Sequence, residues 1–152
     1  MADVLNPEQR QLNMRRIKGK DTQPEMLIRR GLHAQGMRYR LHDRSLPGQP
    51  DLVFPKYHTA VFIHGCFWHA HGCGLSKIPA TRQDFWRAKL SANAVRDGKA
   101  VDALQAAGWR VLVIWECALR GPSRQRASVV LEGAANFIQD SKLNLLEIAG
   151  AD

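Results

Sequence analysis

The chain has 152 residues, 45% of them hydrophobic and 24% charged, which is enough to bury one core of ordinary domain size. Its formal net charge is +8 and its isoelectric point about 9.9, which favours a polyanionic partner, with nucleic acid ahead of a membrane surface. No apolar run approaches a membrane span and the first residues lack the apolar segment of a signal peptide, so we expect a cytoplasmic protein.

The first stretch, from Pro7 to Lys20, is basic and permissive for a helix. Ten of the 22 Lys and Arg residues fall within the first 44 positions, Arg15 and Arg16 among them. Such a run is either a solvated helix face or an arm that lies along phosphates. Met14 stands among these cations, where it could enter a base step as an apolar wedge.

A helix is predicted to begin at residues 21–25, where a capping residue is followed by Pro24 and Glu25. Gly36 is placed to end it. The residues that we expect on its buried face are Met26, Leu27, Leu32 and Ala34.

Three strands are predicted next. Residues 38–42 alternate like a half-exposed strand, and a turn at 45–50 leads into a short strand at 51–54. Residues 59–64 form a nearly continuous apolar run, typical of a strand buried on both faces. The short link between the second and third strands indicates a hairpin and excludes an all-parallel sheet.

A long helix is predicted from Thr81, which has capping-box spacing to Asp84, as far as Gly108, with a bend or break at Gly98. Residues 109–115 are the strongest strand pattern in the chain. Next come a peripheral helix at about 124–138 and an apolar tail at 143–148, to which no structure is assigned. The order of helix, three strands, helix and strand predicts an α/β fold with a mixed sheet flanked by helices.

The densest chemical pattern is the run from His64 to Cys73, which holds three of the six His and two of the three Cys residues. The odd cysteine count of a cytosolic chain argues against disulfides and for a metal. Three thiolates, with Cys117 as the third, and one imidazole make a standard closed zinc set. Spacing does not choose which of the three histidines is the fourth ligand.

A second metal position is predicted beside this run. If the strands at 51–54 and 59–64 pair, Asp51 lies close to Ile63 and His64. A carboxylate beside a main-chain carbonyl suits Mg²⁺, which also meets phosphate oxygens. A phosphodiester hydrolase needs such a site, because the cation polarises the phosphate and stabilises the leaving oxygen.

The element order and Pro50-Asp51 resemble the restriction-endonuclease-like core, although that family's usual pattern has an acidic residue at the position of Phe62 and a Lys at that of His64. A closer resemblance, over roughly residues 8 to 121, is to the very-short-patch repair endonuclease family. It is carried by Pro50-Asp51, the run His64-Gly65-Cys66-Phe67-Trp68-His69, Pro79-Ala80-Thr81-Arg82 with Phe85-Trp86, Trp109-Arg110-Val111-Leu112, and Trp115-Glu116-Cys117-Ala118-Leu119-Arg120-Gly121.

The resemblance implies a Mg²⁺-dependent DNA endonuclease that nicks one strand 5′ of the T in T:G mismatches left by deamination of 5-methylcytosine, and so initiates very short patch repair. It implies a single endonuclease domain over 1–152, with a basic arm at 1–20, a catalytic core at 21–121 and a peripheral segment at 122–152. The implied partners are double-stranded DNA with a T:G mismatch and mismatch-repair proteins, and the family acts as a monomer.

The resemblance also implies residue roles. Asp51 and the Ile63 carbonyl bind the catalytic Mg²⁺, His69 is the general base and His64 assists at the phosphate, while Glu25 holds a metal-bound water. The structural zinc is bound by Cys66, His71, Cys73 and Cys117. The residues implied to contact DNA are Met14, Arg15, Arg16, Phe67, Trp68 and Trp86.

Two other functions remain open from the residues alone. A zinc-stabilised nucleic-acid-binding module without catalysis explains the charge and the cysteines but leaves Asp51, His64 and His69 without a role. A catalytic zinc hydrolase is disfavoured, because sets of three thiolates and one imidazole are usually structural.

Overall fold

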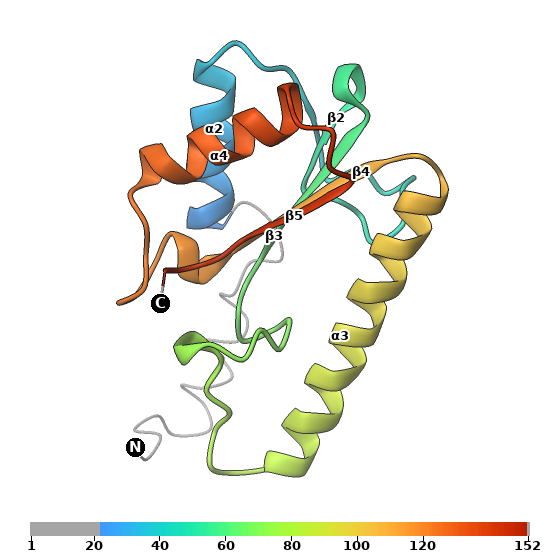
Figure 1. The fold of residues 1–152 in the computed structure, drawn as a ribbon. Coiled ribbons are helices and arrows are strands. Elements are labelled where there is room, and N and C mark those ends of the chain that lie inside the picture. The colour runs from blue at the N-terminus through green and yellow to red at the C-terminus, as the bar shows by residue number, and fades with distance from the viewer. Residues whose placement is uncertain (1–21, 152) are drawn as a thin grey trace.

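A five-stranded mixed sheet is the centre of the computed structural model, which describes residues 22–151 (Figure 1). The strands lie in chain order; β1, β2 and β3 are antiparallel neighbours, whereas β3, β4 and β5 run parallel. The elements are α2 (Gln23–Ala34), β1 (Arg40–Leu41), β2 (Leu52–Phe54), β3 (Thr59–His64), α3 (Gln83–Ala106), β4 (Arg110–Trp115), α4 (Ala127–Gln139) and β5 (Leu145–Ile148).

The predicted order of helix, three strands, helix and strand is confirmed, and so is the mixed sheet. A single turn of 3₁₀ helix, Pro55–Tyr57, connects β2 to β3 and ends at His58, whose φ is +51°. This tight connection sets the register in which Leu52 pairs with Val61. As a result, the start of β2 lies beside the end of β3.

Helices cover both faces of the sheet, α2 and α4 on one side and α3 on the other (Figure 1). Successive side chains of a strand point to opposite faces. In β3, Val61 therefore packs with Ile28 and Phe137 on the first side, whereas Phe62 packs with Leu104 on the second. The prediction that the strand at 59–64 is buried on both faces is confirmed.

The prediction for the buried face of α2 was correct only at Leu32, which is fully buried. Leu27 is 36% exposed, Met26 is half-buried and Ala34 is exposed. The stripe that faces the sheet consists of Glu25, Ile28 and Leu32, which have the spacing of one helix face. A carboxylate therefore occupies a position that a hydrophobic pattern assigns to an apolar residue.

The expected bend at Gly98 was wrong, because α3 is continuous from Gln83 to Ala106. A helical glycine costs only about 1 kcal/mol relative to alanine, so one exposed glycine does not interrupt a helix of 24 residues. The capping box expected at Thr81 does not form either. Arg82 is the N-cap residue, with φ of +56° and no side-chain bond to the helix start.

The C-terminal segment was expected to be peripheral, but it is part of the core. Five residues of α4 are buried, namely Val130, Ala134, Ala135, Phe137 and Ile138. The tail forms β5, which pairs with β4 from Val111 opposite Leu145. Among the described residues, no helix is both long and apolar enough to cross a membrane.

Candidate active site

Two hollows meet at the C-terminal end of β3 and share Ile63, His64 and His69 in their linings. One, of about 670 Å³, extends toward Phe67 and Trp68. The other, of about 510 Å³, extends toward Asp51 and Asp97 and includes Arg44 and Arg96 in its lining. Carboxylates, imidazoles and guanidinium groups thus surround one depression, which suits an anionic substrate.

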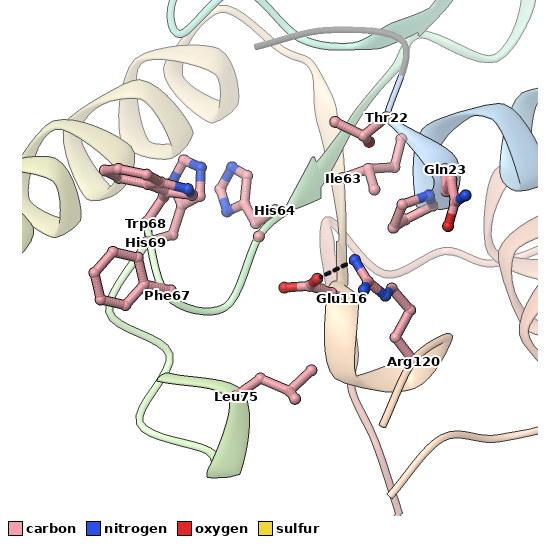
Figure 2. Close-up of a pocket in the computed structure, with 12 residues that line it drawn as sticks. Thr22, Gln23, Ile63, His64, Phe67, Trp68, His69, Leu75, Glu116 and Arg120 are labelled. Atoms are coloured by element: carbon pink, nitrogen blue, oxygen red, sulfur yellow. Dashed lines mark hydrogen bonds and ion pairs between the residues drawn. The ribbon is translucent and has the colours of Figure 1, made fainter. Parts of the chain in front are cut away.

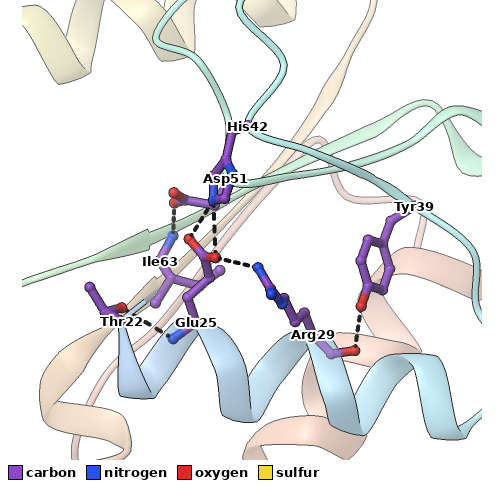
Figure 3. Close-up of polar contacts among 7 residues, drawn as sticks. All are labelled: Thr22, Glu25, Arg29, Tyr39, His42, Asp51 and Ile63. Atoms are coloured by element: carbon purple, nitrogen blue, oxygen red, sulfur yellow. Dashed lines mark hydrogen bonds and ion pairs between the residues drawn. The ribbon is translucent and has the colours of Figure 1, made fainter. Parts of the chain in front are cut away.

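The first group of polar side chains is Glu25, His42 and Asp51, of which Asp51 lines the depression (Figure 3). Glu25 comes from α2 and is only 2% exposed. Its Oε2 accepts from Arg29 at 3.0 Å, and His42 Nε2 lies 3.0 Å from both of its oxygens. One ligand atom from each of the three residues lies within 4.8 Å of the others, so together they could hold a metal ion.

Asp51 directly precedes β2 and reaches the end of β3, where its Oδ2 accepts a 2.7 Å hydrogen bond from the Ile63 N–H. Burial raises the pKa of Asp51 to about 7; the Ile63 N–H opposes this increase and the neighbouring Glu25 adds to it. The amide and carbonyl of one strand residue point to the same side. The Ile63 carbonyl therefore points to the same edge of β3 as the Ile63 N–H, which is the edge beside Asp51.

The second group consists of His64, His69 and Asp97. The two imidazole rings stack with their centroids 3.8 Å apart and their planes 6° from parallel. His69 Nδ1 lies 2.6 Å from Asp97 Oδ2, on the middle of α3. A carboxylate at Nδ1 fixes the proton there and leaves Nε2 as the acceptor, the arrangement that a general base requires.

His64 stays neutral at physiological pH. It is only 7% exposed, and burial lowers its pKa to about 3, with a further decrease from the neighbouring His69. Among the described residues, its Nδ1 is a buried atom with no hydrogen-bond partner. The His64 side chain lines both hollows, so a neutral imidazole stands next to the His69 ring there.

The third group is made of Cys66, His71, Cys73 and Cys117, whose ligand atoms all lie within 4.8 Å of one another. Cys117 Sγ is 3.6 Å from His71 Nδ1. Tetrahedral ligands about 2.0 to 2.3 Å from zinc are roughly 3.3 to 3.8 Å apart, so this spacing fits a closed zinc site. The loop itself separates the histidines, since His71 joins the cysteines while His69 turns to α3.

Cys66 and Cys117 are also tied to the rest of the protein. Cys117 N–H donates to Cys66 Sγ at 3.3 Å, and Gly150 N–H donates to Cys117 Sγ at 3.1 Å. Cys66 N–H donates to Glu116 Oε1 at 3.3 Å. Since Cys66 lies two residues after His64, a metal in this group would hold the loop that carries the imidazoles.

Phe67, Trp68 and Trp86 form one aromatic cluster beside the larger hollow, with edge-to-face contacts at centroid distances of 5.0 to 6.0 Å. All three are half-buried, so they are not core residues. Figure 2 shows Phe67 and Trp68 next to His69 on one side of the hollow, across from Glu116 and Arg120. Met14, Arg15 and Arg16 lie outside the described residues.

Two residues of the site were not foreseen, His42 and Asp97. A search for the carboxylate that orients a base histidine would have found three acids on the long helix, Asp84, Asp97 and Asp102, without choosing among them. His42 ends an alternating strand pattern, and nothing in its spacing connects it to Glu25. Contacts across the fold bring Asp97 into the lining of the depression and His42 against Glu25.

The family model described as DNA mismatch endonuclease Vsr matches residues 2–75. The chain is 45% identical over 138 residues to the DNA mismatch endonuclease Vsr of Escherichia coli (strain K12), covering 91% of this chain and 88% of the relative. It is 48% identical over 119 residues to the Type II nicking enzyme V.XorIIP of Xanthomonas oryzae pv. oryzae, covering 78% and 88%. It is 44% identical over 120 residues to the Type II nicking enzyme V.NmeAIP of Neisseria meningitidis, covering 79% and 86%.

Proposed function

Because this chain belongs to the Vsr family of DNA mismatch endonucleases, we propose that it nicks one strand of duplex DNA 5′ of the T in a T:G mismatch left by deamination of 5-methylcytosine. The nick would initiate very short patch repair. The observation that carries the proposal is the convergence of a carboxylate group and a carboxylate-oriented imidazole on one depression at the end of β3.

Asp51, with the Ile63 carbonyl beside it, is the proposed ligand of a catalytic Mg²⁺, and Glu25 holds a water of that ion. Mg²⁺ bound there would polarise the scissile phosphate and stabilise the leaving oxygen. The raised pKa of Asp51 supports this assignment, since two carboxylates in a desolvated position favour a bound cation.

His69 is the proposed general base. With its Nδ1 proton held by Asp97, Nε2 can take a proton from the attacking water. His64 stacks against His69 and is neutral, so we assign it a hydrogen bond to the phosphate or to the attacking water and not a charge. Arg44 and Arg96 line the same hollow and are placed to attract the phosphate backbone.

Cys66, His71, Cys73 and Cys117 are the proposed ligands of a structural zinc. A site closed by four protein ligands has no position for substrate, so the zinc would stabilise the loop and take no part in hydrolysis. This argument disfavours a catalytic zinc hydrolase. The base with its orienting carboxylate disfavours a binding module without catalysis.

Selectivity for the mismatch is assigned to Phe67, Trp68 and Trp86, which are half-exposed beside the catalytic residues. Entry of such rings into the base stack requires unstacking, which costs least at a mismatch. The basic arm, with Met14, Arg15 and Arg16, is proposed to contact the other groove and the phosphates. An asymmetric mismatch suits a monomer, and mismatch-repair proteins are the proposed further partners.

One assay tests the function. Strand-labelled duplexes with a T:G pair or a matched C:G pair are incubated with the zinc-loaded protein in Mg²⁺, in EDTA and without added metal. We expect a nick 5′ of the T only in the T:G duplex and only with Mg²⁺. Equal nicking of both duplexes would refute mismatch specificity, and full activity in EDTA would refute the Mg²⁺ assignment.

A further inference from the structure

Backbone hydrogen bonds hold His42 against the proposed catalytic cation site. Its backbone, at φ +46°, donates an N–H to the carbonyl of Asp51 at 3.0 Å. The next residue, Asp43, donates to the carbonyl of Pro50 at 3.2 Å, so two consecutive bonds fix this segment to the start of β2. The imidazole is 23% exposed and points toward Glu25 (Figure 3).

The spacing of the ligand atoms fits a cation between them. His42 Nε2 is 3.0 Å from each oxygen of Glu25, and Asp51 offers an oxygen within 4.8 Å of both. Two adjacent ligands about 2.1 Å from an octahedral ion are about 3.0 Å apart.

We propose that His42 is a direct nitrogen ligand of the divalent cation held by Asp51 and Glu25, and that it shifts this site from Mg²⁺ toward first-row transition ions such as Mn²⁺. The inference rests on the proposed function, in which this cation is the catalytic one. It adds a ligand and an ion preference to the proposed roles of Asp51 and Ile63, and it places Glu25 in direct contact with the ion, where the proposed function has a water between them.

The chemical reason is the donor set. Mg²⁺ is a hard ion that prefers oxygen ligands and retains its waters. Divalent first-row transition ions accept imidazole more readily. One nitrogen ligand beside two carboxylates therefore raises the affinity for Mn²⁺ relative to that for Mg²⁺ without changing the charge of the site. An amide in place of the imidazole returns the site to oxygen donors.

A purely structural role for His42 makes a different prediction. If His42 only donates a hydrogen bond to Glu25, a Gln of similar reach replaces it and the ratio of Mn²⁺ to Mg²⁺ affinity stays unchanged. If His42 binds the ion, the same substitution removes nitrogen from the coordination shell. The two roles therefore separate in a binding measurement that requires no turnover.

The test uses the zinc-loaded full chain and Mn²⁺ alone as the probe. Electron paramagnetic resonance counts bound Mn²⁺, competition with Mg²⁺ gives the affinity ratio, and electron spin echo modulation detects a directly bound ¹⁴N. The variants are His42→Gln, with His42→Asn as a second form in case the first fails to fold. His58→Gln is the matched control, because His58 is exposed at the opposite end of β3.

We expect wild type to bind one Mn²⁺ that Asp51→Asn abolishes, with ¹⁴N modulation that remains in His69→Asn. His42→Gln should lose the modulation and lower the Mn²⁺ to Mg²⁺ affinity ratio about tenfold, whereas His58→Gln should change neither.

Any one of four results would overturn the inference. Two concern the ¹⁴N modulation, namely its absence in wild type or its survival in His42→Gln. The others are Mn²⁺ binding that Asp51→Asn does not change, and a Mn²⁺ to Mg²⁺ affinity ratio of His42→Gln within twofold of wild type. The proposed function is tested separately, since it requires that wild type nick the T:G duplex with Mg²⁺, whichever ligands hold Mn²⁺.

Discussion

Asp51→Asn should abolish nicking and at the same time stabilise the metal-free protein at pH 8. The folded-state pKa of Asp51 is raised from 3.8 to about 7, mainly by burial. The folded protein therefore binds more protons than the unfolded chain between these two values, and its stability falls as the pH rises through them. Asn is never ionised, so the substitution removes this loss and keeps an oxygen for the Ile63 N–H.

The magnitude follows from the size of the shift. A pKa raised from 3.8 to about 7 corresponds to at most about 4 kcal/mol, and partial solvent access to Asp51 reduces this to about 1 to 2 kcal/mol at pH 8. For a chain of this length the gain is about 3 to 6 °C in Tm. At pH 4, where the folded Asp51 is protonated, the two proteins should melt within about 1 °C of each other.

The assay is a pair of thermal melts at pH 4 and pH 8, with and without Mg²⁺, on zinc-loaded protein. Mg²⁺ should raise the Tm of wild type but not of Asp51→Asn, because only the carboxylate binds it. Asp43→Asn is the control, since hydrogen bonds from Ser45 lower the pKa of Asp43. It should not be stabilised at pH 8. A Tm of Asp51→Asn at or below that of wild type at pH 8 would refute the reasoning.

Three further changes test the rest of the site. Asp97→Asn should lower single-turnover nicking about 10- to 100-fold, with little change in Tm, because it removes a charged hydrogen bond that orients His69. Cys117→Ser should lose zinc in metal analysis and lower the unfolding free energy by about 2 kcal/mol or more. Trp68→Ala should cost about 1 kcal/mol of stability but bring T:G binding close to that of matched duplex, measured at one salt concentration.

Each of these has a matched comparison. Asp102→Asn alters an exposed acid on the same helix and should leave the nicking rate within threefold of wild type. If Asp102→Asn and Asp97→Asn lowered the nicking rate equally, the orienting role of Asp97 would be refuted. A Cys117→Ser protein that retains one zinc per chain would contradict the ligand assignment. Trp109 is a half-buried Trp stacked on His58 at the far end of the sheet, and Trp109→Ala should leave T:G preference intact. If Trp68→Ala also preserved that preference, Trp68 would have only a packing role.

Local patterns were sufficient for the order of the elements as far as α4 and for the loop whose Cys and His residues could bind a metal. The strands at 59–64 and 109–115 are continuous apolar runs, and such runs are informative because a buried strand needs apolar side chains on both faces. The run from His64 to Cys73 is short, so its ligands are necessarily near one another whatever the fold. The predictions of a bend at Gly98 and a cap at Thr81 were wrong, because a local preference of about 1 kcal/mol does not by itself decide where a helix begins or bends.

Contacts between distant segments were decided only by the tertiary structure. The sequence by itself determined the α/β class and the residue types of the site, but not that Asp97 lies at His69, that His42 lies at Glu25, or that the tail forms β5. Each of these depends on the angle at which a helix or strand meets the sheet, and one helical residue turns a side chain by about 100°. Burial of the Glu25 carboxylate likewise depends on Arg29 and His42, partners that only the assembled fold brings together.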